Sequence, residues 1–234
     1  MIWLVVPPGH HWRQSSGRPA DENHNRCLVD SVLSCAGGCT DGVVWAIGSG
    51  RRMSVFVTGA ESFVGRALAM ACDELSIQIE GVDHVKGVLP RWQHADIRDP
   101  ALADLIPDGS IVVHLAAISR DSDCRLDPKT AFDVNVNGTL NVADAARKRG
   151  CTQIVFASSE WVYGDVSNTG VQAEDAAIDG TRLNSEYAIS KLVAERLLQL
   201  GSYVPATTIL RFGIIYGPRE SNFSAVESLL RKVH

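Results

Sequence analysis

From residue 53 onward, short runs of β-branched and apolar residues alternate with longer stretches of helical periodicity. The runs that predict strands are SVFVTG at 54–59, SIQIEGVD at 76–83, IVVHLAA at 111–117, QIVFASS at 153–159 and ATTILRF at 206–212. Helices are expected at 63–73, 129–149 and 185–200, with a shorter one at about 222–233. This alternation favours an α/β fold, a doubly wound parallel sheet with helices on both faces.

The first 52 residues differ in character from the rest. They are rich in Gly, Pro, Ser and Asn and show neither the period of a strand nor that of a helix. We therefore expect an irregular, disordered extension at 1–52 and one domain at 53–234, with Met53 as the natural start. The extension holds His10, His11, His24, Cys27, Cys35 and Cys39, but the spacing C-x7-C-x3-C is no standard zinc pattern, so no metal site is predicted.

Composition narrows the function classes. Hydrophobic residues make up 45% and charged residues 21% of the chain, which is typical of a globular protein with a sizeable core. A net charge of −5 without a Lys/Arg run gives no attraction to nucleic acid or anionic lipid. No apolar run approaches the ~20 residues that span a bilayer, and the opening MIWLVVPPGHH lacks the basic start of a secretory signal. We expect a cytoplasmic protein without a membrane partner.

The segment VFVTGAESFVGRAL joins a β-rich strand to an amphipathic helix through Gly59 and Gly65. This is where dinucleotide-binding folds present helix N-terminal amides to a pyrophosphate. Asp83 ends the next strand, where a carboxylate accepts hydrogen bonds from the adenosine ribose and repels a 2′-phosphate, so NAD is favoured over NADP. Ser62 replaces the usual middle glycine. Its Cβ lies where the backbone approaches the phosphates, although its hydroxyl is able to bond a phosphate oxygen.

A second set of polar residues points to chemistry. Tyr187 and Lys191 lie four residues apart in SEYAISK, so on a helix they share one face, and Ile189, Val193, Leu197 and Leu200 form an apolar stripe on the far side. A free phenol has a pKa of ~10, and a nearby ammonium favours the phenolate. Ser159 ends a predicted strand, where doubly wound folds place ligands. The alternative for Ser159 is a turn or cap residue.

At this point residues 53–234 resemble the NAD-dependent epimerase/dehydratase family, the extended branch of the short-chain dehydrogenases/reductases, which have a Rossmann fold. The motifs that carry the resemblance, in chain order, are VTGAESFVG, HADIRD, VVHLAA, DVNVNGTLNV, FASSEWVYGD, YAISK and LRFGIIYGPR. Their order and separation are more specific than any one motif.

The resemblance implies a role for each matching position. Ser159, Tyr187 and Lys191 would be catalytic, with Tyr187 removing a hydroxyl proton as hydride passes to NAD and Ser159 bonding the oxygen of the transient ketone. Return of the hydride to the other face would invert the carbon. The positions implied along the NAD cofactor are Gly59, Ser62, Phe63, Val64, Gly65, Asp83, Asp96, Ile97, Ala116, Ala117, Asn135, Tyr187 and Lys191. Asp96 and Ile97 would lie near the adenine, and Lys191 would bond the nicotinamide ribose. A nucleotide-sugar substrate and a homodimer are implied as well.

Two departures from the family pattern bear on the substrate. Dehydratases of the family follow the hydroxyl residue with an Asp-Glu pair, whereas this chain has Glu160 and Trp161, which argues against elimination. Ile214 stands where an Asn often contacts the substrate diphosphate. Relatives continue beyond the LRFGIIYGPR segment, so the C-terminal substrate lobe is expected to be truncated.

Three functions are open at this stage. The first is an epimerase acting on a nucleotide-sugar. The second is a non-catalytic NAD-binding regulatory protein, which would not need Ser159, Tyr187 and Lys191 together. The third is a simple carbonyl reductase, which would use the same residues and consume added NADH.

Overall fold

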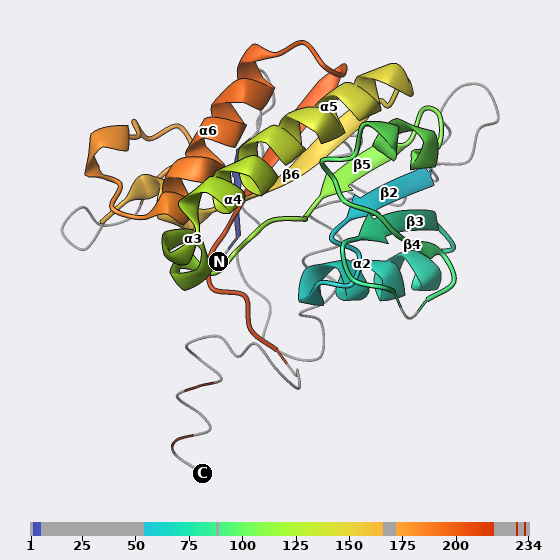
Figure 1. Ribbon diagram of the computed structural model, residues 1–234, viewed down its shortest axis with the longest axis horizontal. Coiled ribbons are helices and arrows are strands. Elements are labelled where there is room, and N and C mark those ends of the chain that lie inside the picture. The colour runs from blue at the N-terminus through green and yellow to red at the C-terminus, as the bar shows by residue number, and fades with distance from the viewer. Residues whose placement is uncertain are drawn as a thin grey trace.

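One mixed sheet organises the part of the chain that the structure describes. The computed structural model describes residues 2–5, 54–87, 89–165 and 172–217, and positions 228 and 232. Its strands are β1 (Ile2–Val5), β2 (Ser54–Thr58), β3 (Gln78–Asp83), β4 (Trp92–His94), β5 (Ile111–His114), β6 (Gln153–Ser159) and β7 (Ala206–Phe212). They lie in the order β1-β7-β6-β5-β2-β3-β4, and all neighbours are parallel except β1 and β7 (Figure 1).

The strand order confirms the doubly wound fold. The chain moves outward from β2 through β3 to β4, then returns to the other side of β2 and runs outward again through β5, β6 and β7. The direction of winding therefore reverses between β2 and β5. Because ligands of open α/β sheets bind at the carboxyl ends of the strands at such a reversal, the ends of β2 and β5 mark the place to search for a site.

Two strands were not expected from the sequence. In β4 only three residues pair with β3, too few to show a period. In β1, Ile2–Val5 pairs antiparallel with β7, so the expectation of irregular structure is wrong for these four residues. The backbone of the run IWLV pairs with the edge strand β7 and satisfies its backbone hydrogen-bonding groups. This edge exists only once the sheet has assembled, so the sequence pattern does not reveal the pairing. The rest of the segment 1–52 lies outside the described residues.

The helices largely follow the predicted periodicity. The α-helices are α2 (Phe63–Glu74), α3 (Asp121–Leu126), α4 (Pro128–Phe132), α5 (Thr139–Lys148) and α6 (Glu186–Leu200), and short 3₁₀ helices are η1 (Pro100–Leu105), η3 (Glu160–Tyr163) and η4 (Gly180–Arg182). The long helix expected at 129–149 is instead α4 and α5 joined by the π-helical turn η2 (Asp133–Gly138). The helix expected at 222–233 lies outside the described residues, apart from two single positions. None of the described helices is long and apolar enough to cross a membrane.

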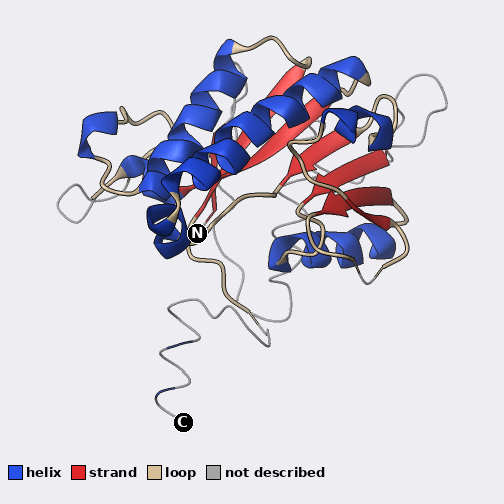
Figure 2. Ribbon diagram, in the orientation of Figure 1, coloured by secondary structure: helices blue, strands red, loops and turns tan. Residues whose placement is uncertain are grey.

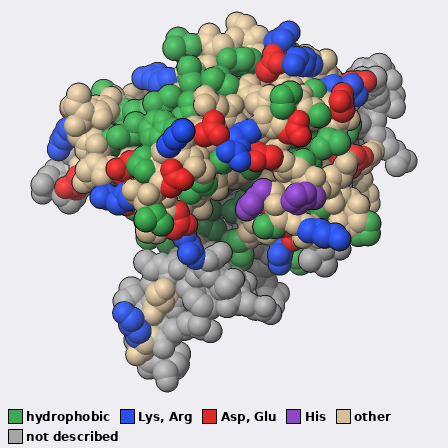
Figure 3. Space-filling model, viewed as in Figure 1, with side chains coloured by type: hydrophobic (Ala, Val, Ile, Leu, Met, Phe, Trp, Pro, Cys, Tyr) green, Lys and Arg blue, Asp and Glu red, His purple; other side chains and the backbone are tan. Residues whose placement is uncertain are grey.

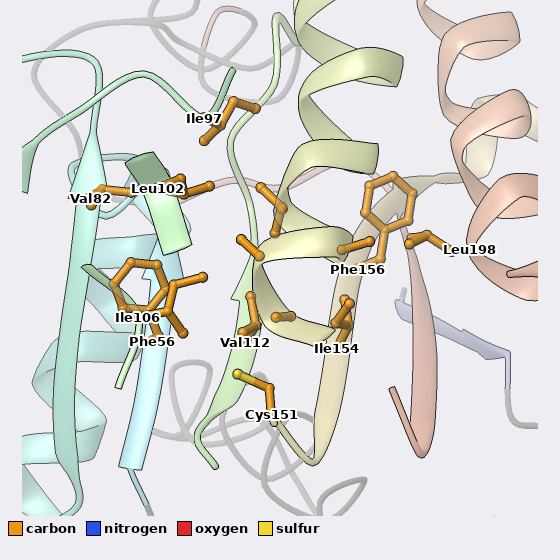
Figure 4. Packing of buried hydrophobic residues seen from close by; sticks show 14 of the residues in the cluster. Phe56, Val82, Ile97, Leu102, Ile106, Val112, Cys151, Ile154, Phe156 and Leu198 are labelled. Atoms are coloured by element: carbon orange, nitrogen blue, oxygen red, sulfur yellow. The ribbon is translucent and has the colours of Figure 1, made fainter. Parts of the chain in front are cut away.

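Helices cover both faces of the sheet (Figure 2). Successive side chains of a strand point to opposite faces, so Val55 and Val57 pack with Leu68 of α2 on one face, whereas Phe56 belongs to the cluster on the other. Figure 4 shows this second cluster, in which Phe156 lies beside Leu198 of α6. The strands are thus buried on both faces, as their nearly continuous apolar sequences predict.

A buried histidine links the two central strands. His114, the last residue of β5, bonds Thr58 Oγ1 at 2.6 Å through Nδ1 and Thr139 Oγ1 at 2.9 Å through Nε2. Burial, and to a smaller extent the charge of Lys191, lowers the pKa of His114 from 6.5 to about 3. His114 is therefore neutral in the folded protein, and its ring joins β2, β5 and α5 just below the carboxyl edge of the sheet.

We predict that His114→Gln weakens the acid sensitivity of folding. The unfolded chain protonates His114 below about pH 6.5, while the folded chain does not do so until about pH 3, so this contribution to stability is complete above pH 6.5 and declines as the pH falls. Between pH 7 and pH 5 the native protein should lose about 2 kcal/mol more free energy of unfolding than the variant, measured by urea denaturation. Equal losses in the two proteins would contradict the assignment of a neutral, buried His114.

Candidate active site

The loop after β2 is packed tightly against the loop after β5. Gly59 has a φ of 74°, and a Cβ at this position would lie 2.7 Å from Ala116 N and 3.0 Å from its Cα. At Gly65 a Cβ would lie 2.6 Å from the carbonyl oxygens of Gly59 and Ala60. Glycine is thus required at both positions. Gly59 needs it for its positive φ and for the close contact, and Gly65 needs it for the close contact alone. The close approach brings together two of the segments that the sequence analysis assigned to the cofactor.

Ser62 acts as the N-cap of α2. Its φ of −64° and ψ of 162° suit any residue, so the backbone does not require the glycine that usually occupies this position. Its Oγ accepts a hydrogen bond of 3.0 Å from Gly65 N, which satisfies one amide of the first helical turn. Among the residues that the structure describes, none accepts the hydroxyl proton of Ser62. Phe63 and Val64 are the first two residues of the helix that Ser62 caps.

Asp83 ends β3 beside this loop, and its carboxylate is buried. Oδ2 accepts a hydrogen bond from Glu61 N at 2.9 Å, and Oδ1 accepts one from Val85 N at 3.1 Å and contacts His84 Nδ1 at 3.0 Å. A carboxylate has about four acceptor positions, and His84 is mostly exposed. The carboxylate therefore keeps capacity for ribose hydroxyls, at the strand end where the sequence analysis expected it.

Asp96 and Ile97 follow β4 and differ in exposure. The Asp96 carboxylate pairs with Arg98 at 2.6 Å, which lowers its pKa, and Arg98 also pairs with Asp133 at 2.8 Å. The Ile97 side chain is buried against Gly138 of the π-helical turn. The structure thus gives Ile97 a packing role, whereas Asp96 is half-exposed and near the surface.

Asn135 fixes the loop that carries Ala116 and Ala117. Its amide Nδ2 donates to Ile118 O and to Ser190 Oγ, both at 3.0 Å, and its Oδ1 accepts from Ile118 N at 2.8 Å. Both N–H groups are thus used within the protein. Asn135 therefore holds the loop after β5 against α6, and this bonding is how it would influence a bound cofactor.

Lys191 is almost completely buried, with 2% of its surface exposed. Its Nζ donates to Ala157 O at 2.7 Å and lies 4.7 Å from the centre of the Phe156 ring. Burial lowers the pKa of Lys191 to about 8, although the charge of Glu195 acts in the opposite direction. Ala157 O is its one hydrogen-bond partner among the residues that the structure describes. An ammonium has three N–H donors, so the group is suited to bind hydroxyls of a ligand.

Tyr187 lies on the same face of α6, as the spacing predicted. The Lys191 Nζ is 6.0 Å from the centre of its ring. Burial raises the pKa of Tyr187 to about 12, and a hydrogen bond with Ser159 acts against that rise. A lysine with a pKa of about 8 loses its charge before such a phenol ionises. The expectation that the ammonium favours the phenolate is therefore not met by these two side chains alone.

Ser159 is a cap residue, one of the two roles that the sequence left open, and its catalytic role stays a prediction. It is the N-cap of η3, with its Oγ accepting from Trp161 N at 3.2 Å, and it also bonds Tyr187. The exposed indole of Trp161 packs edge-on against the Tyr187 ring, with the ring centres 6.2 Å apart. Ser159, Tyr187 and Lys191 therefore meet at the carboxyl end of β6.

A buried ion pair that sequence analysis missed supports these residues. Arg211 of β7 bonds the Glu195 carboxylate at 3.0 and 2.7 Å, and Ser158 Oγ bonds the same carboxylate. Arg211 also donates to Tyr163 Oη at 2.8 Å and to Glu174 O at 3.1 Å. The signal was the position of Glu195, which is four residues after Lys191 and so shares its buried helix face.

Cys124 of α3 was also missed, and it lies near the same site. Its Sγ donates to Ile118 O at 3.4 Å, and burial raises the pKa of the thiol. Its charge, when ionised, would raise the pKa of both Tyr187 and Lys191. No cluster of His, Cys, Asp or Glu within the described ranges could hold a metal ion.

Comparison with known proteins gives relatives that are named as reductases and as epimerases. GDP-6-deoxy-D-mannose reductase of Pseudomonas aeruginosa is 32% identical over 151 residues, which cover 63% of this chain and 47% of that protein. UDP-glucose 4-epimerase of Haemophilus influenzae is 27% identical over 189 residues, which cover 72% and 55%. The chain thus spans about half the length of these relatives.

A solved structure and a family model support the same relationship. The crystal structure of Thermus thermophilus UDP-glucose 4-epimerase in complex with NAD superposes with a TM-score of 0.65 at 29% identity, covering 76% of this chain and 61% of that one. The sequence model of the NAD dependent epimerase/dehydratase family matches residues 55–234. The glycine loop, the carboxylate of Asp83 and the buried ammonium of Lys191 fit a dinucleotide. The chain therefore belongs to the NAD dependent epimerase/dehydratase family, with a Rossmann fold and NAD as its cofactor.

Proposed function

We propose that the protein is an epimerase that acts on a nucleotide-sugar through bound NAD. The observation that carries the proposal is the meeting of Ser159, Tyr187 and Lys191 at the carboxyl edge of the sheet, next to the loops of Gly59 and Ala116. A pure binding protein has no need of a tyrosine, a serine and a buried lysine in one place. The relatives named UDP-glucose 4-epimerase support the choice of substrate class.

In the proposed site NAD would lie across the ends of β2 and β5. Gly59, Ser62, Phe63, Val64 and Gly65 would hold its pyrophosphate through the loop and the first turn of α2. Asp83 would bond the adenosine ribose, and Asp96 and Ile97 would border the adenine. Ala116 and Ala117, on the loop that Asn135 holds, would form the wall towards the nicotinamide. Lys191 would donate its remaining N–H groups to the nicotinamide ribose. When bound, NAD supplies the hydride acceptor and a positive charge on its nicotinamide ring.

Tyr187 is the proton carrier in this proposal. Its pKa of about 12 keeps the phenol protonated at neutral pH, ready to donate to a carbonyl oxygen. Taking a proton from a substrate hydroxyl needs the phenolate, which additional positive charge and the Ser159 hydrogen bond both favour. Ser159 would hold the reacting oxygen, next to the indole of Trp161, which packs edge-on against the Tyr187 ring.

A reductase is the second candidate. The protonated phenol of Tyr187 suits the reduction of a carbonyl, and the relative from Pseudomonas aeruginosa is named a reductase. Two assays separate the functions, one with UDP-glucose and NAD and one with a nucleotide-linked keto-sugar and NADH. Formation of the epimeric sugar without net change in NADH absorbance supports the epimerase, whereas net consumption of NADH with a keto-sugar supports the reductase. Neither reaction with any nucleotide-sugar would favour an NAD-binding regulatory protein.

We predict that Tyr187→Phe lowers turnover by about 10²- to 10⁴-fold and leaves NAD affinity nearly unchanged, because the phenol oxygen acts on the substrate proton. Ser159→Ala should lower turnover by about 10²- to 10³-fold, through loss of one hydrogen bond to the reacting oxygen. Lys191→Met should reduce both turnover and NAD affinity. Steady-state kinetics and calorimetry measure the two effects. Turnover at the native rate in Tyr187→Phe would rule out this mechanism.

We also infer a homodimer, as the family resemblance implies. The stripe Ile189, Val193, Leu197 and Leu200 is half-exposed or exposed rather than buried within the chain, and Leu200 is 83% exposed. Figure 3 shows hydrophobic side chains gathered over α6 and the adjoining part of α5. An apolar helix face of this kind is a suitable surface for a second copy. The cytoplasmic location expected from the sequence stays a prediction.

A double substitution of the stripe tests the dimer. Val193→Glu with Leu197→Glu should convert a dimer into a folded monomer, because four carboxylates would meet in the interface. Light scattering after size exclusion gives the mass, and circular dichroism checks the fold. Met70→Glu with Leu75→Glu, at an exposed apolar position of α2 and at its exposed C-cap on the other face of the sheet, is the matched control and should leave the mass unchanged. A monomeric native protein would refute the inference.

A further inference from the structure

We infer that Glu61 is a second residue that selects NAD against NADP, and that it does so both by its own charge and by holding Arg66. The inference rests on the proposed position of the adenosine ribose at Asp83. The sequence assigns the preference for NAD to Asp83 alone. The inference adds the Glu61 carboxylate and the Arg66 guanidinium that is paired with it.

Glu61 is fixed beside Asp83 by its backbone. Its amide donates to Asp83 Oδ2 at 2.9 Å, so the two residues are in direct contact at the end of β3. Its carboxylate is only 5% exposed. A Cβ on Gly87 would lie 3.1 Å from Glu61 Oε1, which places that oxygen against the backbone of the loop after β3. The side chain therefore lies between that loop and the start of α2.

Arg66 holds the other oxygen of the carboxylate. Its Nε and its Nη2 both lie 3.0 Å from Glu61 Oε2, while the Arg66 side chain is 62% exposed. A guanidinium has a planar set of donors that fits phosphate oxygens. Glu61 directs two of the contacts of this guanidinium towards itself, and so reduces what Arg66 can offer to a phosphate nearby.

The positions of Asp83, Glu61 and Arg66 disfavour the 2′-phosphate of NADP in two ways. The phosphate would carry close to two negative charges. It would extend from a ribose that is bonded to Asp83, next to Glu61, whose amide donates to the Asp83 carboxylate. The buried Asp83 carboxylate would then repel it, the Glu61 carboxylate would add a second negative charge next to Asp83, and Arg66 is already paired with Glu61. The 2′-hydroxyl of NAD has no charge and can donate to a carboxylate, so NAD meets neither obstacle.

A simpler role for Glu61 would be structural. An acidic residue near a helix N-terminus interacts favourably with the helix dipole, and an exposed partner such as Arg66 adds little stability. That role predicts a loss of stability on substitution and equal changes in the affinities for NAD and NADP. The specificity role predicts a change in the ratio of the two affinities.

The experiment measures the dissociation constants of NAD and NADP by calorimetry for the native protein and matched variants. Glu61→Gln keeps an acceptor for Arg66 but removes the charge, and should improve NADP affinity relative to NAD by about tenfold. Glu61→Ala also releases Arg66, and should improve it further. Adding Arg66→Ala to Glu61→Ala should remove this second increment. Glu74→Gln removes one charge from the exposed far end of α2 and should change neither constant.

The outcomes separate the inference from the assumption beneath it. A constant NAD to NADP ratio in both Glu61 variants overturns the inference, provided that Asp83→Ala weakens NAD binding. If Asp83→Ala leaves NAD binding unchanged, the proposed position of the ribose is wrong, and the role of Glu61 falls with it. Thermal melting of each variant identifies a loss of fold, and Glu61→Gln preserves the shape of the side chain that it replaces.

Discussion

The buried ion pair between Glu195 and Arg211 is the interaction on which the arrangement of the candidate active site depends. It ties α6 to β7, and through Ser158 it ties both to the end of β6. Taking two charges out of water costs several kcal/mol each, so such a pair contributes little net stability by itself. Its effect is geometric. The residue after Ser158 is Ser159, and Lys191 lies one helical turn before Glu195. The Glu195 carboxylate therefore fixes β6 and α6 together at the place where the candidate catalytic groups meet.

A second polar link repeats this principle in the centre of the sheet. His114 joins Thr58 and Thr139, and Thr58 Oγ1 also accepts from Ala116 N at 3.4 Å. Both links are buried, and both end at the carboxyl edge of parallel strands. Polar groups inside a core are costly unless every one is bonded, and when bonded they favour one arrangement over its neighbours. The apolar clusters supply the driving force of folding, while these links determine where the loops lie.

Sequence alone predicted five of the seven described strands and the shared helix face of Tyr187 and Lys191, because both depend on local pattern. The strands at 153–159 and 206–212 were found with the predicted bounds, and Tyr187 and Lys191 share a helix face as their spacing requires. Features that arise from assembly were not predictable. The π-helical turn of 133–138 carries Asn135 into its contact with Ser190, and β1 depends on the edge of β7. The pKa of Tyr187 depends mainly on burial, and the spacing of Tyr187 and Lys191 along the sequence does not predict how deeply the side chains are buried.

Ser62 has a consequence for how the site is prepared. A glycine at this position would have no side chain to cap the first turn of α2, so an amide of that turn would need another partner. Here the Ser62 hydroxyl already holds Gly65 N, while Asp83 holds Glu61 N from the other side. The loop thus takes its shape during folding. The entropy of ordering it belongs to the folding reaction, and the dinucleotide meets a rigid template rather than a chain that it must organise.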